Sequence, residues 1–172
     1  MMTSWQKDCW SMSFPGAAIT AATGGIATKR VLQNWQARGQ WLTTLPLPKH
    51  GRVYAYSFAH LIEALIVVEL GAFGFTSDLA RTVIRTRFAA EAKKNQHIEM
   101  LADFREPRLC WAVSVPPRAE GETPTSLVVS LFEPKQMPET IEGWRSFVVL
   151  NIPLIVKRAR EFALDGDDDG NP

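Results

Sequence analysis

The chain has 172 residues, of which 46% are hydrophobic and 22% are charged, so it can bury the core of a globular protein. Its two cysteines, Cys9 and Cys110, are too few for the disulfide scaffold of a small secreted protein. The most apolar run, residues 61–75, contains two glutamates and is shorter than the ~20 apolar residues of a membrane helix. These features exclude the disulfide-rich and membrane-spanning classes. Together with an N-terminus that does not resemble a signal sequence, they predict a soluble cytoplasmic protein.

The net charge is only +1, but the charges are unevenly distributed along the chain. No Asp or Glu occurs between Asp8 and Glu63, whereas the same segment contains these basic residues: Lys29, Arg30, Arg38, Lys49 and Arg52. Duplex DNA carries one negative charge per ~1.7 Å of its axis, and a surface without carboxylates does not repel it. The uneven charge therefore favours a nucleic-acid partner for the N-terminal third of the chain.

The N-terminal residues predict an arm followed by two helices. Residues 1–13 show no periodicity and are interpreted as a poorly ordered arm or as a strap over the domain. A helix is expected over 15–23, with Pro15 in its first turn and Gly24-Gly25 as a sharp reversal, because glycine adopts positive φ without strain. A second helix is expected over 27–38, and its periodicity predicts a buried face made of Val31, Leu32 and Trp35.

A hairpin and two further helices are expected next. The hairpin covers residues 41–56 and is interrupted in its middle by Pro46, Pro48 and Gly51. Ser57 is a suitable N-cap for a helix that ends at Gly71. Another helix is expected from Thr76 or Ser77 to about residue 94, with these apolar residues facing inward: Leu79, Val83, Ile84 and Phe88.

The composition becomes rich in β-forming residues after about residue 106. Strands are predicted over 109–115, 127–132 and 147–150, and a last helix over 152–164 with Asn151 as its cap. In the first strand, larger apolar residues alternate with small ones, so one face is apolar and the other is small. The last helix is expected to cover one side of the sheet, and the other side is expected to pack against a second copy or to line an effector pocket. The acidic end, residues 165–172, is expected to be disordered.

Short motifs follow one another in a characteristic order over about residues 14–88. They are Thr23-Gly24, Leu32-Gln33-Asn34-Trp35 with Arg38-Gly39, Gly51-Arg52-Val53-Tyr54, Tyr56-Ser57-Phe58-Ala59-His60-Leu61, Leu70-Gly71 and Gly74-Phe75-Thr76. In this order they resemble the winged helix-turn-helix head of the MerR family of transcription regulators. The family commonly continues with a long dimerisation helix, which is interrupted here at 93–97 and followed by a β-rich segment. Metal-sensing members carry clustered cysteines, which this chain lacks.

The predicted fold class is therefore α+β, a winged helix-turn-helix N-terminal domain followed by a small β-β-β-α C-terminal domain. The predicted segments are an arm over 1–13, the MerR-like domain with its following helices over 14–105, a dimerisation or effector domain over 106–164, and an acidic tail over 165–172.

The candidate DNA-binding residues lie on the second helix and on the hairpin. Helix residues that can donate hydrogen bonds to base edges and phosphates suit the major groove. Arg52 and Tyr54 are two residues apart on a strand and so point to one side, with Lys49 and His50 at the hairpin tip. The full candidate set is Thr28, Lys29, Arg30, Gln33, Asn34, Lys49, His50, Arg52 and Tyr54.

The resemblance implies a sequence-specific, double-stranded-DNA-binding transcriptional regulator that acts as a homodimer on an inverted repeat in the bacterial nucleoid. RNA polymerase is a further candidate partner. Two alternatives stay open: an excisionase-like architectural DNA-binding factor, and a protein–protein adaptor that does not bind DNA. No enzyme is expected, because the sequence offers no nucleophile–base pair, phosphate-binding glycine loop or paired carboxylates. No metal or cofactor is expected, and His60 and His97 are assigned to packing or to a helix surface.

Overall fold

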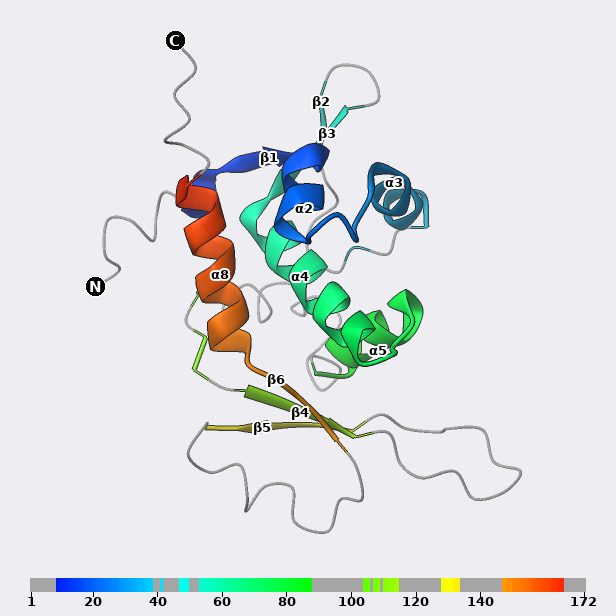
Figure 1. Cartoon of the computed structure of the whole chain (residues 1–172), viewed down its shortest axis with the longest axis vertical. Helices are drawn as coiled ribbons and strands as arrows, with labels where there is room; N and C mark the ends of the chain where they lie inside the picture. Colours follow the sequence, from blue (N-terminus) through cyan, green and yellow to red (C-terminus); the bar gives the residue numbers. More distant parts are fainter. Residues whose placement is uncertain are drawn as a thin grey trace. The chain divides into compact units, whose positions relative to one another are not determined.

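The computed structural model describes residues 9–38, 41, 47–49, 53–87, 104–105, 107–108, 110–114, 128–133 and 147–165. These residues form a mixture of helices and two small antiparallel sheets, which confirms a mixed α+β composition (Figure 1). The chain divides into two compact units, one made of Met1–Val68 with Leu154–Pro172 and the other of Glu69–Pro153. Both ends of the chain thus belong to one unit and its middle to the other. The composition instead predicts a single boundary near residue 106.

The first unit contains a three-stranded antiparallel sheet. Its strands are β1 (Ser13–Pro15), β2 (Leu47–Lys49) and β3 (Val53–Ser57), in the order β1-β3-β2. Strands β2 and β3 confirm the predicted hairpin, and Lys49 pairs with Val53. Pro48 was expected to interrupt the hairpin but lies within β2 opposite Tyr54. Proline is tolerated there because β2 is an edge strand, where an N–H on the outer side needs no partner strand.

Strand β1 begins at Ser13, where the sequence predicts the end of an arm, so this strand was not predicted. Pairing with β3 places Phe14 opposite Tyr56, and Phe14 is buried. Ahead of β1, residues 9–11 are helical, and the Trp10 ring meets the Phe58 ring edge-on with centroids 5.1 Å apart. A strand of three residues is too short to show a period-2 pattern, so it can be recognised only from its pairing with β3.

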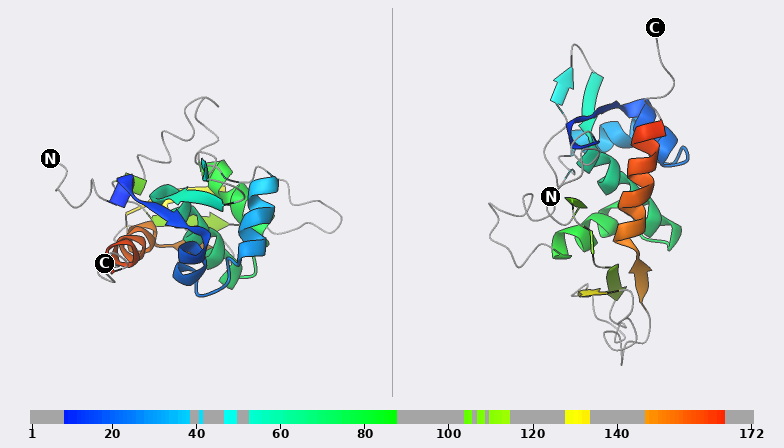
Figure 2. Two further views of the ribbon diagram at one scale, coloured as in Figure 1. Left: turned by 90° about the horizontal axis from the view of Figure 1, so that it is seen from above. Right: turned by 90° about the vertical axis from the view of Figure 1, so that its left-hand side faces the viewer.

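Helices α2 (Gly16–Ala22) and α3 (Lys29–Ala37) confirm the two helices predicted at the start of the chain. Each is slightly shorter than predicted at both ends, and the last expected residues, Thr23 and Arg38, are the C-caps. Pro15 is the N-cap of α2 with ψ 157°, and not a residue of its first turn. Helix α3 and the C-terminal helix α8 (Ile152–Asp165) lie on opposite sides of the first unit (Figure 1 and Figure 2).

Helix α4 (Phe58–Ala72) begins in the first unit and ends in the second. Its residues 58–67 are buried except for Leu65, which is half-buried, so this stretch is buried on all sides. The buried residues include His60, which agrees with the packing role expected for it. His97 lies outside the described residues.

The prediction that α4 ends at Gly71 is wrong, because Gly71 is still helical. The helix ends in a Schellman motif, in which Gly74 has φ 85°. The Gly74 N–H donates to the Gly71 carbonyl at 2.9 Å, and the Phe75 N–H donates to the Leu70 carbonyl at 3.2 Å. The second of two nearby glycines therefore ends the helix, since it occupies the position that requires positive φ.

In the second unit, α5 (Ser77–Arg87) confirms the start of the predicted helix at Ser77. Thr76 caps it, and its hydroxyl accepts a hydrogen bond from the Leu79 N–H at 3.2 Å. Leu79 was expected to face inward but is 36% exposed, whereas Arg81 is 1% exposed. Val83 and Ile84 are buried as predicted, so the inward face departs from the predicted one only at Leu79 and Arg81 among the described residues. The expected continuation from Phe88 to residue 94 lies outside the described residues.

The second unit also contains the sheet of β4 (Cys110–Ser114), β5 (Val128–Phe132) and β6 (Val148–Leu150), in the order β5-β4-β6. All three strands were predicted to within one residue of their observed ends. Cys110 and Ala112 pack with Phe132 on one face of the sheet, and Trp111 and Val113 on the other face are also buried. The central strand is thus buried on both faces.

The last predicted helix is confirmed as α8, and it includes Asp165 from the expected tail. Its buried residues include Ile155 and Ala159, whereas Phe162 is half-buried. Residues 166–172 lie outside the described residues. Among the helices that the structure describes, none combines the length and the apolar character that crossing a membrane requires.

Candidate nucleic-acid interface

The turn between α2 and α3 has a defined geometry. Gly24 and Gly25 have φ of 62° and 84°. The Gly24 N–H donates to the Ala21 carbonyl at 3.0 Å, and the Gly25 N–H donates to the Thr20 carbonyl at 2.8 Å. These bonds form a Schellman motif and confirm the reversal predicted at the glycine pair.

Two threonine hydroxyls fasten the turn to the residues that precede α3. The buried Thr23 hydroxyl accepts the Ala27 N–H at 3.2 Å and lies 2.9 Å from the Ile19 carbonyl, to which it can donate. The Thr20 hydroxyl lies 2.7 Å from the Ala27 carbonyl. Ala27 is thus held through both its backbone groups, and the direction in which α3 leaves the turn is fixed. These bonds are not evident from the sequence, because the partners are four and seven residues apart.

Replacing Thr23 with valine should destabilise the turn. The buried Ala27 N–H would lose its acceptor, which costs about 1–3 kcal/mol for a buried group. Urea unfolding followed by circular dichroism would measure the loss. Thr23→Ser, which keeps the hydroxyl, should stay within about 1 kcal/mol of the wild type. Equal stability of the valine variant and the wild type would contradict this role.

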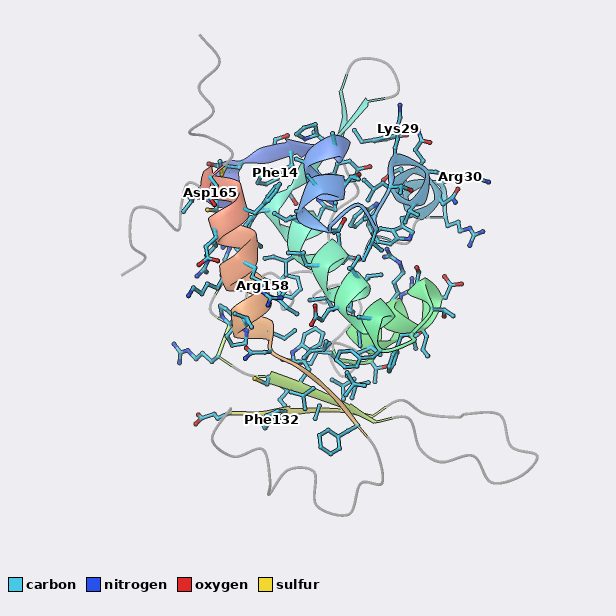
Figure 3. All side chains as sticks on the ribbon, viewed as in Figure 1. Phe14, Lys29, Arg30, Phe132, Arg158 and Asp165 are labelled. Carbon is cyan, nitrogen blue, oxygen red and sulfur yellow. The ribbon has the colours of Figure 1, made fainter. Side chains whose placement is uncertain are left out.

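Helix α3 is divided into a buried and an exposed face, as predicted. Leu32 is 1% exposed and Trp35 is 4% exposed, while Val31 is half-buried. The polar candidates on this helix are all exposed: Lys29, Arg30, Gln33 and Asn34. In Figure 3 the Lys29 and Arg30 side chains extend from α3 into solvent. Four groups able to donate hydrogen bonds are therefore presented on a single short helix.

Thr28 stands immediately before this exposed face and is the N-cap of α3. Its hydroxyl oxygen accepts a hydrogen bond from the Val31 N–H at 3.4 Å. The hydroxyl thus helps to define where α3 begins. This capping role differs from the DNA-binding role predicted for Thr28.

The candidates on the hairpin are only partly described. Lys49 ends β2, but its side chain and the whole of His50 and Arg52 lie outside the described residues. Tyr54 lies on β3 and is half-buried. Tyr56 is two residues further along the same strand and is buried. Burial raises the pKa of the Tyr56 phenol, and nearby Tyr54 raises this pKa further, so Tyr56 is neutral at physiological pH.

A hollow of about 300 Å³ lies where α2, α3 and β3 meet. We call it the α2–α3–β3 hollow, and its lining residues are Pro15, Gly16, Ala17, Thr20, Lys29, Leu32, Gln33, Tyr54 and Tyr56. Lys29, Gln33 and Tyr54 are three of the predicted site residues, and the hollow brings them together. Arg30 and Asn34 do not line it. The small residues that form its α2 side carry no signal of a site in the sequence.

The hollow exists partly because position 16 is a glycine. A Cβ added to Gly16 would lie 3.5 Å from Tyr56 Cε2 and 3.6 Å from Leu32 Cδ1. These are ordinary contact distances, so the glycine keeps the hollow open without being required by a steric clash. The φ of Gly16 is not positive, so its backbone conformation does not require glycine.

Comparisons with known proteins do not add a family to this geometry: no protein-family model and no curated protein matches the chain. The described residues also contain no group of three or more His, Cys, Asp or Glu side chains that could hold a metal ion.

Proposed function

We propose that this protein is a sequence-specific transcription regulator that binds double-stranded DNA, with α3 in the major groove and the β2–β3 hairpin as a wing. The observation that carries the proposal is the exposed face of α3, which presents Lys29, Arg30, Gln33 and Asn34 in a segment free of carboxylates from residue 9 to residue 62. An Arg can pair bidentately with guanine, and Gln or Asn with adenine.

The arrangement of the first unit supports this proposal. The elements follow the order β1, α2, α3, β2, β3, and the hairpin is joined to β1 through β3. With its side chains an α-helix such as α3 is about 10–12 Å across, which fits the ~12 Å width of the major groove. The hollow also links the N-terminal turn of α3 to β3, so the helix and the proposed wing share one surface.

The proposal includes a homodimer on an inverted repeat. A single DNA-binding module covers only about 600–1,000 Å² of surface, which rarely gives tight specific binding by itself. Two-fold symmetry doubles the contacts and requires half-sites separated by whole helical turns. The second unit is the proposed site of self-association, with effector binding as a further role, and RNA polymerase is a proposed partner at the promoter.

DNA binding can be tested by fluorescence anisotropy with labelled duplexes at about 50 to 200 mM salt. The affinity for a random duplex should fall as salt rises, because phosphate contacts release counterions. The double variant Lys29→Gln, Arg30→Gln should reduce the salt slope by about two phosphate contacts. Arg158→Gln removes an exposed charge on α8, on the opposite side of the first unit, and should leave the slope unchanged.

The same assay separates base contacts from backbone contacts. Gln33→Ala and Asn34→Ala should each weaken binding to a site selected from random duplexes by about 1–3 kcal/mol, with little effect on random DNA. Titration at high protein concentration should give two chains per selected site. Negligible affinity that does not change with salt would instead support a protein–protein adaptor.

A further inference from the structure

The α2–α3–β3 hollow has mainly apolar walls. Its apolar lining residues are Pro15, Gly16, Ala17 and the buried Leu32, and it is also lined by Tyr54 and Tyr56. A volume of about 300 Å³ is at the lower end of the range for small-molecule sites. Walls of this kind favour an apolar, flat occupant, because aromatic rings pack well against tyrosine rings.

The polar groups of the hollow favour an anionic occupant. Lys29 contributes a positive charge, and none of the described lining residues is acidic. The Thr20 hydroxyl is directed to backbone carbonyls, 2.7 Å from that of Ala27 and 3.0 Å from that of Gly16. Gln33 adds an exposed amide beside Lys29. The charged and amide groups therefore belong to α3, opposite the small residues of α2.

A DNA phosphate matches this combination poorly. The two non-bridging oxygens of a DNA phosphate could bind Lys29 as a carboxylate could, but a phosphate carries no apolar ring to cover the carbon-lined walls of the hollow. A phosphate would bind Lys29 from outside and leave the hollow unfilled. An occupant that fills it needs an apolar body and a single anionic group.

We propose that the α2–α3–β3 hollow binds a small aromatic carboxylate, with its ring against Tyr54 and Tyr56 and its carboxylate at Lys29, and that this ligand competes with DNA. The competition rests on the proposed function, because Lys29 and Gln33 belong both to the hollow and to the proposed DNA surface. The ligand site itself does not depend on it. If such a metabolite releases the protein from DNA, α3 would bind both the ligand and the DNA.

The ligand site can be tested with the full-length protein and 2-naphthoate as the probe. Titration followed by amide chemical shifts in NMR spectra should give saturable shifts at the lining residues of α2, α3 and β3. The neutral analogue 2-naphthylmethanol should bind about tenfold more weakly, because it cannot form a charged contact with Lys29. Absence of saturable shifts, or shifts confined to other residues, would overturn the proposal.

Two pairs of variants localise the site. Ala17→Leu fills the hollow from an exposed position and should weaken naphthoate binding by about tenfold or more. Ala21→Leu makes the same change one turn later on α2, outside the lining, and should leave binding unchanged. Lys29→Gln should weaken binding by about tenfold, whereas Arg30→Gln should not. Equal affinities within either pair would contradict the assignment.

The competition is tested by adding 2-naphthoate to a preformed complex with labelled duplex. We expect DNA release at naphthoate concentrations near the dissociation constant measured by NMR, and no release from the Ala17→Leu variant. If naphthoate binds but the protein has no DNA affinity, the proposed function fails and the ligand site stands. If DNA binds and naphthoate does not, the ligand proposal alone fails. Simultaneous binding of both would refute the competition.

Discussion

Trp35→Ala is expected to lower the free energy of unfolding by about 3–5 kcal/mol, the range for truncating a large buried aromatic residue. The Trp35 side chain is 4% exposed, and its ring meets the edge of Trp41 at a centroid distance of 5.4 Å. Leu32 and Trp35 are the buried residues of α3. A helix of nine residues is not stable alone in water, so losing one of these two contacts should also loosen α3 itself.

Urea unfolding measured by tryptophan fluorescence and circular dichroism would test this expectation. Asn34→Ala provides the matched control, because Asn34 precedes Trp35 on the same helix and is exposed. It should change stability by no more than about 0.5 kcal/mol. Trp35→Phe should fall between the two. A loss below about 1 kcal/mol for Trp35→Ala would mean that α3 is held in place by other contacts.

His60→Ala is expected to cost about 3 kcal/mol, through a cavity and an unpaired backbone donor. His60 is 1% exposed and lies in the first turn of α4. Its Nδ1 accepts the Ser57 N–H at 2.9 Å and lies 2.7 Å from the Ser57 hydroxyl. The Trp41 ring meets the imidazole edge-on with centroids 4.9 Å apart. His60 thus takes the place of the Glu or Gln that closes a capping box.

His60→Gln separates the two contributions in the same unfolding assay. The glutamine amide oxygen can accept the Ser57 N–H, as it does in an ordinary capping box, but it cannot restore the ring contact with Trp41. We expect stability between that of the wild type and that of His60→Ala. If the glutamine variant is no more stable than the alanine variant, the hydrogen bond contributes nothing measurable and packing alone fixes this helix start. Wild-type stability of the alanine variant would contradict both contributions.

The sequence predicted those parts of the fold that local patterns determine. The two faces of α3 follow from a helical period, and the reversal at Gly24-Gly25 follows from the conformational freedom of glycine. Pairing between distant residues was not predictable in this way. Strand β1 exists through its pairing with β3, about forty residues later. The burial of Arg81 in place of Leu79 likewise depends on tertiary packing that overrides the pattern of α5.

The candidate site was predictable only where its residues carry obvious chemistry. Lys29, Gln33 and Tyr54 were selected because their side chains can donate hydrogen bonds, and all three line the hollow. Gly16 and Ala17 were not selected, because small residues have no functional signature in a sequence. They contribute by leaving space unfilled. That space can be recognised only once the residues across the hollow, such as Leu32 and Tyr56, are located.

The glycines at the helix ends also limit which positions of this sequence can change during evolution. Gly24, Gly25 and Gly74 all have positive φ, where a residue with a Cβ is strained by about 1–2 kcal/mol. The exposed face of α3 carries no such restriction and is free to change with whatever it recognises. Distant relatives should therefore share little at the proposed DNA-binding surface and still keep the paired and the single glycine at the same intervals. The spacing of these three glycines is a better guide to ancestry than the residues that would meet DNA.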